Sequence, residues 1–446
     1  MYKKFHQVLF AVVMVVALNA CIESPGAPTT SALTPAAGAV PAATTPHFSQ
    51  PTAITHAFYP VAQIAQAIWL GTAAGEANRV EATLLPENKR IHWRDAEVET
   101  RVVQVIDYRT DMLVSVADHY FAQADDGSVY ALGADVSNYA AGQMVDQTGS
   151  WLAGLDGATP ILMMPAQFVV GSFYTAPQDM ANPIIQSCAI VTLAQAAMTP
   201  AGPTDKGVLI KETLADGTVK NSTYAESWGM LATETNGESL ALVLLNRSAA
   251  QPGALPTPLV TIEAEAEDLI DFIPSGNWGV ISKDVTAIST AWQNYQSQLG
   301  TDHVPAPFVT ALEAALAQLQ THAAAKATVA THQAANDVSA ALMDLMALYQ
   351  PTPPVDLGRL DVLGRQVILD VGAADFTAAA NTLAKSNAIW ARLKPIVLAH
   401  DGAAVAADYE ASLATQADAL HNQDVATLTN EATAALELVD DLEQLF

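Results

Sequence analysis

The chain contains little cysteine and few basic side chains. Only Cys21 and Cys188 occur among its 446 residues, so internal disulfides cannot hold the fold together. The 19 Lys and Arg stand against 46 Asp and Glu, a formal net charge of −27. Such an acidic chain is repelled by nucleic-acid phosphates and by anionic lipid head groups. Composition therefore excludes nucleic acid as a partner and excludes membrane binding through a basic surface.

Several catalytic motifs are also missing. The sequence has no Gly-x-Ser-x-Gly, no His-Glu-x-x-His, no phosphate-binding glycine loop and no Cys-x-x-Cys-His haem attachment. A Ser-His-Asp site can be assembled from distant positions, so an unrecognised hydrolase is kept as the third interpretation. We expect a protein that is not an enzyme and has no cofactor.

The first twenty residues have the layout of a secretory signal. Lys3 and Lys4 precede an apolar run, Val8–Leu18, that is too short for a comfortable membrane span. The run ends at Leu18-Asn19-Ala20-Cys21, which resembles the cleavage site of bacterial lipoproteins. The resemblance implies removal of residues 1–20 and lipid modification (palmitate) of Cys21.

The predicted anchor also gives a location. Cleavage leaves 17 basic against 46 acidic side chains, a net charge of −29, so membrane attachment must come from the acyl chains. Ile22 follows the cysteine, and the absence of Asp there implies, by resemblance to Gram-negative lipoproteins, the periplasmic side of the outer membrane. Residues 21–54 are rich in Ala, Thr, Pro and Ser and are expected to form a flexible tether.

Residues 55–262 have the period of β-strands. Apolar runs such as 102–106 and 240–245 are separated by the turn dipeptides Asp126-Gly127, Asp156-Gly157, Asp216-Gly217 and Asn236-Gly237. We therefore predict an antiparallel β domain, built as two sheets or as a partly closed barrel. Together with the helical region described below, this is an α+β, multidomain chain.

Part of this region resembles a known family. The resemblance rests on Tyr120-Phe121-Ala122-Gln123, Asp125-Asp126-Gly127, Gly149-Ser150-Trp151 and Asp156-Gly157-Ala158, with the entry His56-Ala57-Phe58-Tyr59-Pro60. These residues are similar to those of an uncharacterised family of secreted bacterial proteins over about residues 55–235. The resemblance implies a fold but no catalytic residues.

The second half is alanine-rich and helical in period. An acidic linker is expected at residues 263–283, where Glu263, Glu265, Glu267, Asp268 and Asp271 precede a Pro-Ser-Gly-Asn break. A helical bundle is expected at 284–446, with a three-helix repeat over 284–349 and 375–446. Trp292, Glu313 and Asn336 of the first copy correspond to Trp390, Glu410 and Asn430 of the second. Between the copies, a connecting helix over 356–370 is predicted to begin at Asp356 as N-cap, with Arg359 and Arg365 pairing with acids.

The helical region also contains the residues considered for metal binding. Imidazole and thioether ligands suit copper, and the candidates are His322, His332, Met343, Met346, His400 and His421. No two histidines stand three or four residues apart, so one helix face does not encode a site. A periplasmic copper-handling protein is therefore the alternative interpretation.

Three other features have simpler explanations. Cys188 lies in an apolar run and is expected to be a buried, inert thiol. Met163-Met164 is expected to pack in the core, and Asp125-Asp126-Gly127-Ser128 to form a hairpin turn and not a calcium loop. The preferred interpretation is a non-enzymatic, outer-membrane-anchored periplasmic lipoprotein that binds a protein or small-molecule ligand.

Overall fold

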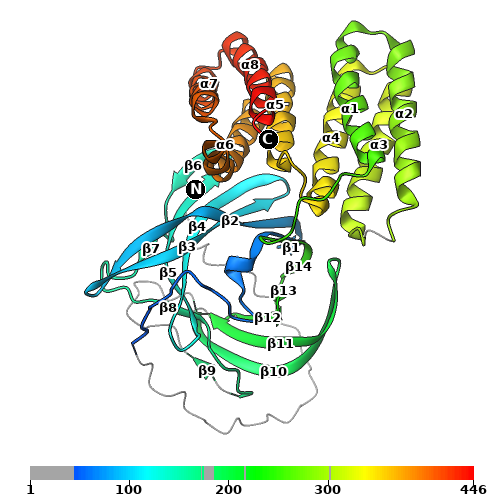
Figure 1. Ribbon diagram of the computed structural model, residues 1–446. Coiled ribbons are helices and arrows are strands. Elements are labelled where there is room, and N and C mark those ends of the chain that lie inside the picture. Colours follow the sequence, from blue (N-terminus) through cyan, green and yellow to red (C-terminus); the bar gives the residue numbers. More distant parts are fainter. Residues whose placement is uncertain (1–44, 172, 175–184, 215–216, 301–302) are drawn as a thin grey trace, which may run out of the picture. The chain divides into compact units, whose positions relative to one another are not determined.

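The computed structural model describes residues 45–171, 173–174, 185–214, 217–300 and 303–446 (Figure 1). Two compact units are present. The β unit covers the described residues up to Asn138 and Asp146–Ser248, and the helical unit covers Tyr139–Val145 and Ala249–Phe446. No described helix is both long and apolar enough to cross a membrane.

Up to Ser248 the described chain forms a short 3-10 helix, η1 (Val61–Gln63), and then strands, of which β6 falls mostly in the Tyr139–Val145 segment of the helical unit. The strands are β1 (Ile64–Ala73), β2 (Glu76–Trp93), β3 (Ala96–Arg109), β4 (Met112–Gln123), β5 (Val129–Ala140), β6 (Gln143–Asp146), β7 (Trp151–Leu152), β8 (Ile161–Met164), β9 (Phe173–Tyr174), β10 (Ile185–Thr199), β11 (Gly202–Leu214), β12 (Val219–Ala225), β13 (Gly229–Thr235) and β14 (Glu238–Arg247). Two of the predicted turn glycines, Gly127 and Gly237, join consecutive strands with positive φ angles of 93° and 99°, which only glycine adopts without strain.

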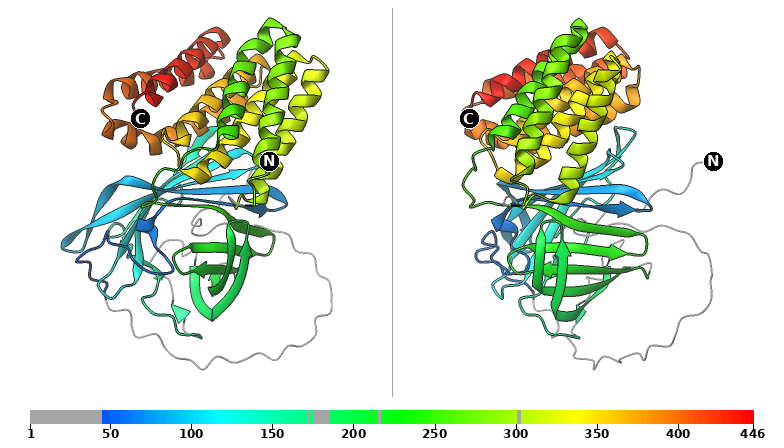
Figure 2. Two further views of the ribbon diagram at one scale, coloured as in Figure 1. Left: turned by 45° about the vertical axis from the view of Figure 1, so that its right-hand side comes forward. Right: turned by 90° about the vertical axis from the view of Figure 1, so that its right-hand side faces the viewer.

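These strands form one antiparallel sheet in the order β6-β5-β4-β3-β2-β1-β14-β13-β12-β11-β10-β9, with β7 and β8 also paired to β5. The sheet curls over itself, so that β10–β13 fold beneath β1–β4 (Figure 2). Tyr59 demonstrates the curl, because its ring lies 5.6 Å from that of Phe121 on β4 and 6.4 Å from that of Tyr224 on β12. Five strands separate β4 from β12 in the sheet order. The predicted β domain is confirmed as a single curled sheet that does not close.

Alternation along β4 shows which side chains face the inside of the curl. His119 and Phe121 lie on the inner face, where Phe121 belongs to the main buried cluster. Tyr120 and Ala122 lie on the outer face and belong to a second cluster with Leu132. Successive residues of a strand point to opposite faces, so this part of the sheet has a core on each side.

The helical unit contains eight helices: α1 (Thr257–Phe272), α2 (Trp278–Gln296), α3 (Ala306–Ala324), α4 (Thr328–Met346), α5 (Val355–Gly372), α6 (Phe376–Ala399), α7 (Ala403–His421) and α8 (Val425–Glu443). Two further short 3-10 helices, η2 (Ile273–Ser275) and η3 (Ala347–Tyr349), follow α1 and α4. The predicted acidic linker at 263–283 is wrong, because most of it lies in α1, η2 and the start of α2. Leu259, Ile262, Ala266 and Leu269 are completely buried at helical spacing, and this apolar stripe holds the acidic segment as a helix.

The eight helices are two four-helix bundles with the same packing order. In α1–α4 and in α5–α8 alike, the first helix contacts the second and the fourth, and the third contacts the fourth. The predicted repeat therefore gains a helix at the start of each copy, α1 and α5.

Equivalent contacts in the two bundles agree with this repeat. Trp292 on α2 and Trp390 on α6 are 5% and 4% exposed. One turn later, Gln296 donates to Glu313 Oε1 at 3.0 Å, while Lys394 pairs with Glu410 at the equivalent place. Both tryptophans are thus buried in the core, and each lies one turn before a polar contact between the second and third helices of its bundle.

Asp356 is not the N-cap of the connecting helix. Pro354 holds that place, and α5 begins at Val355 without a side-chain cap. The Asp356 carboxylate instead accepts hydrogen bonds from Arg359 and Arg392. The predicted pairing of Arg359 and Arg365 with acids is confirmed, since Arg359 contacts Asp344 at 3.1 Å and Arg365 contacts Glu267 at 3.3 Å.

Candidate functional site

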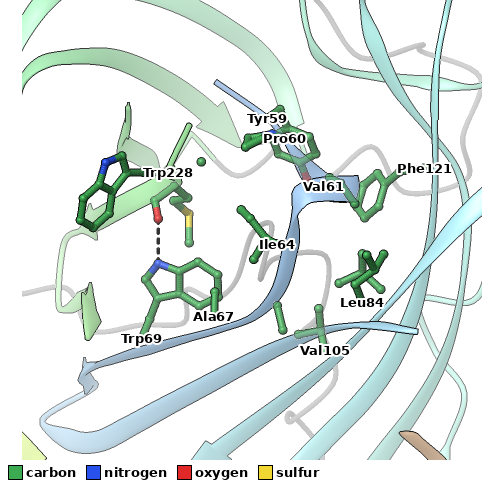
Figure 3. A pocket seen from close by; sticks show the side chains of 14 residues that line it. Tyr59, Pro60, Val61, Ile64, Ala67, Trp69, Leu84, Val105, Phe121 and Trp228 are labelled. Atoms are coloured by element: carbon green, nitrogen blue, oxygen red, sulfur yellow. Dashed lines mark hydrogen bonds between the residues drawn. The ribbon is translucent and has the colours of Figure 1, made fainter. Parts of the chain in front are cut away.

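The inner face of the curled sheet contains an apolar pocket with a volume of about 90 Å³ (Figure 3). Side chains from η1, from β1–β4 and from the start of β13 surround it. Its lining residues are Tyr59, Pro60, Val61, Ile64, Ala67, Trp69, Ala82, Leu84, Val103, Val105, Phe121, Trp228, Gly229 and Met230.

The pocket exists because small side chains meet in one row across the sheet. Ala67 on β1 pairs with Ala82 on β2, and Ala82 pairs with Val105 on β3. Larger side chains, Trp69 and Leu84, stand two residues away on the same face. Directly opposed residues in a sheet lie about 5 Å apart, so a row of two alanines and a valine between bulky neighbours leaves open space.

Two indoles form one wall of the pocket. Figure 3 shows Trp69 and Trp228 on one side, with Phe121 and Leu84 on the other. The Trp69 Nε1 atom donates a buried hydrogen bond to the carbonyl oxygen of Met230 at 3.0 Å. Because this bond satisfies the only polar atom of the Trp69 side chain, the ring presents a purely apolar face to the pocket.

No ionisable group except the Tyr59 hydroxyl is found among the lining residues. A buried charge pair in the same unit, Glu212 on β11 and Lys220 on β12, lies 3.5 Å apart and is 3% and 2% exposed. Burial raises the pKa of Glu212, and Lys220 opposes that rise. Burial and the nearby Glu212 charge both raise the pKa of Tyr59, so its hydroxyl is neutral at physiological pH.

This arrangement can bind but has no groups for bond-breaking chemistry. The lining contains no Ser, Cys, Lys, His or carboxylate, and therefore no nucleophile beside a base. Apolar cavities of roughly 150 Å³ bind benzene. This pocket is smaller but open on one side, so it accommodates an alkyl segment or one edge of a ring, and the rest of the ligand extends beyond it.

The comparisons with known proteins add nothing to this geometry. No protein-family model, no curated protein and no solved structure matches the chain. The expected family resemblance over about residues 55–235 stays a prediction, and function has to be argued from the pocket itself.

The predicted lipidation site, Cys21, and most of the tether at 21–54 lie outside the described residues. The metal candidates lie at separate places in the helical unit. His322 is in the last turn of α3, His332 is near the start of α4, His400 follows α6, and His421 ends α7. Met343 and Met346 are buried on α4 at 3% and 4% exposure.

Their surroundings give no reason to group these residues around a metal. Met343 packs against Gly358 of α5, and the His400 ring donates to the Ile396 carbonyl oxygen and lies 4.4 Å from the Phe446 ring. Across the described ranges, no cluster of three or more His, Cys, Asp or Glu side chains could hold a metal ion.

The simpler explanations of other motifs agree with the structure. Cys188 is buried in the main core of the β unit at 3% exposure, and Met164 is completely buried there. Asp125 receives hydrogen bonds from Ser49 and His47, while Asp126 accepts one from the Ser128 amide within the hairpin turn.

Sequence reasoning missed the pocket residues. Tyr59, Pro60 and Phe121 belong to the stretches that carry the family resemblance, but nothing in the sequence indicates that Trp69, Trp228 and Phe121 surround a common space. The signal was a strand pattern with alanine where neighbouring positions on the same face carry large side chains, as at Ala67 and Ala82. That signal has meaning only once the strand register is known.

Proposed function

We propose that this chain is a lipid-anchored protein on the periplasmic side of the bacterial outer membrane, whose β unit binds an apolar ligand. The observation that carries the proposal is the pocket, since its walls are apolar and include two indoles. An apolar ligand gains about 0.8 kcal/mol for each methylene removed from water. Five methylenes then contribute about 4 kcal/mol, which corresponds to a dissociation constant near 1 mM from the pocket alone.

The anchor part of the proposal rests on the sequence at Cys21. Cys21→Ser should abolish palmitate incorporation and move the protein from the membrane fraction to the soluble fraction. Equal labelling of both forms would remove the basis for the anchor without affecting the pocket.

The binding part is tested by filling the pocket. Ala82→Phe places a ring between Ala67 and Val105, and it should abolish binding of N-phenyl-1-naphthylamine, an apolar dye that fluoresces when removed from water. The matched control is Ala77→Phe, an exposed position on the same strand, which should bind the dye as the wild type does. Thermal unfolding of each variant establishes that Ala82→Phe is folded.

Two results would contradict the binding proposal. The first is a wild-type protein that does not enhance dye fluorescence. The second is a folded Ala82→Phe variant that binds the dye as well as Ala77→Phe does. Mass spectrometry of an organic extract of the purified wild type adds an independent readout, because a retained natural ligand should be absent from the extract of Ala82→Phe.

A further inference from the structure

A buried histidine lies beside the pocket on the same face of the sheet. His119 on β4 pairs directly with Val103 on β3, and Val103 lines the pocket. The His119 ring stacks on Phe121, another lining residue, with ring centroids 6.0 Å apart and planes 21° apart. Only 5% of His119 is exposed, so its imidazole belongs to the interior of the β unit.

The imidazole of His119 makes no hydrogen bond within the part of the chain that the structure describes. Buried polar groups normally have a partner. Burial lowers the pKa of His119 to about 4, so the ring is neutral near pH 7 and offers one N–H donor and one nitrogen acceptor. A second hydrogen-bonding group is close by, because Phe121 also lies against Tyr59, whose neutral hydroxyl belongs to the pocket lining.

Charge decides what kind of ligand group fits between these residues. An ionised group brought into the interior without a partner pays a large desolvation cost. The pocket lining has no cation to pair with a carboxylate, and Lys220 is already paired with Glu212. The Glu212 charge also acts on Tyr59 and would repel a second anion. An uncharged oxygen, in contrast, can exchange hydrogen bonds with Tyr59 and His119.

We propose that Tyr59 and His119, on either side of Phe121, form a polar subsite that binds the hydroxyl or ester oxygen of a neutral lipid. The inference rests on the proposed function, because the alkyl chain of that lipid occupies the apolar pocket. It goes further by naming the ligand class as uncharged amphiphiles with an alcohol or ester group, and by excluding ionised fatty acids.

The test uses ligands with one chain and different head groups. Displacement of N-phenyl-1-naphthylamine is measured at pH 8 with 1-decanol, with decanoate and with decyltrimethylammonium. With the wild-type protein, 1-decanol should displace the dye at a concentration at least tenfold lower than either ion does. Tyr59→Phe, which removes only the hydroxyl, and His119→Leu should each raise the effective concentration of 1-decanol about threefold to tenfold, the range expected for one net hydrogen bond.

Controls separate this inference from the proposed function. Tyr139→Phe and His92→Leu make the same substitutions outside the pocket and should leave 1-decanol displacement unchanged. If wild type and both pocket variants bind the dye but respond equally to 1-decanol, or if decanoate displaces the dye as well as 1-decanol does, the polar subsite is refuted while the apolar pocket stands. If wild type fails to bind the dye, the proposed function falls and the subsite falls with it.

Discussion

The ion pair at the start of α5 gives a quantitative prediction. Asp356 accepts hydrogen bonds from Arg392 Nε at 2.7 Å and Arg392 Nη2 at 2.8 Å, and from Arg359 Nη1 at 2.8 Å. The Arg392 side chain is 1% exposed and forms an ion pair with Asp356. Removing one member of a buried pair costs about 3–5 kcal/mol, because the other charge is left buried without compensation.

Asp356→Ala should therefore lower the unfolding free energy of the helical unit by about 3–5 kcal/mol. In a unit of this size each kcal/mol corresponds to roughly 2–4 °C in Tm, so the expected drop is about 6–20 °C. The assay is thermal unfolding followed by circular dichroism at 222 nm, where helices dominate. Asp408→Ala, at an exposed position on α7, is the matched control and should change stability by less than about 0.5 kcal/mol.

The double variant Asp356→Leu/Arg392→Met distinguishes a lost charge pair from general damage to α5. Replacing both charges by apolar groups is often neutral or stabilising, so this variant should recover most of the stability lost in Asp356→Ala. Burial alone would raise the pKa of Asp356, but Arg392 and Arg359 lower it below its usual range. The contribution of the pair should therefore be present at neutral pH and be lost as the pH falls through the low folded-state pKa. A drop below 1 kcal/mol for Asp356→Ala, or no recovery in the double variant, would refute the reasoning.

Three further predictions concern the helical unit. Burial, opposed by Arg365, raises the pKa of Asp361 to about 7, and burial beside Glu267 raises that of Glu263 to about 7. The unfolded state loses these protons near pH 4 and the folded state near pH 7, so each group should lower the unfolding free energy by about 2–3 kcal/mol as the pH rises from 5 to 8. Asp361→Asn should flatten this dependence in denaturant titrations at several pH values, and an equally steep profile would contradict the assignment. Trp292→Ala and Trp390→Ala should each cost about 3–5 kcal/mol while the dye-binding pocket of the β unit is retained, and a large effect of only one substitution would count against the repeat. Protein purified without chelators should contain less than one equivalent of copper by elemental analysis, and a full equivalent that is lost in His332→Ala would favour the metal-handling interpretation.

Local patterns in the sequence predicted the class of each half and some of the hairpin turns of the β unit. Period-2 runs broken by Asp-Gly and Asn-Gly dipeptides specify an antiparallel sheet, because glycine at positive φ closes tight turns wherever the strands finally pair. They do not specify that β1 pairs with β14, which requires contacts between residues about 170 positions apart, such as Trp69 and Leu242. The pocket depends on that pairing and on the curl, so its residues could not be collected from the sequence.

The acidic segment shows why composition was a poor guide at the boundary between the halves. Glu263, Glu265 and Glu267 suggest a solvated linker by composition, but the completely buried stripe of Ile262, Ala266 and Leu269 at helical spacing decides the structure. The same argument explains Asp356. A carboxylate after three prolines is typical of a helix start. Its actual partner, Arg392, is on α6 and lies 36 residues further along the chain.

The two bundles share one packing order, but equivalent residues of the repeat can differ in how deeply they are buried. Asn336 on α4 is 1% exposed and donates to the Val362 carbonyl oxygen and to Gln366 Oε1 on α5, at 3.1 and 3.0 Å. Its counterpart in the repeat, Asn430 on α8, is exposed. The side chain is the same and its place in the bundle is equivalent, yet only α4 has the first helix of another bundle packed against it. A buried amide costs free energy unless its hydrogen bonds are replaced, so the two acceptors on α5, the Val362 carbonyl oxygen and Gln366 Oε1, offset the burial of the Asn336 amide nitrogen on this face of α4.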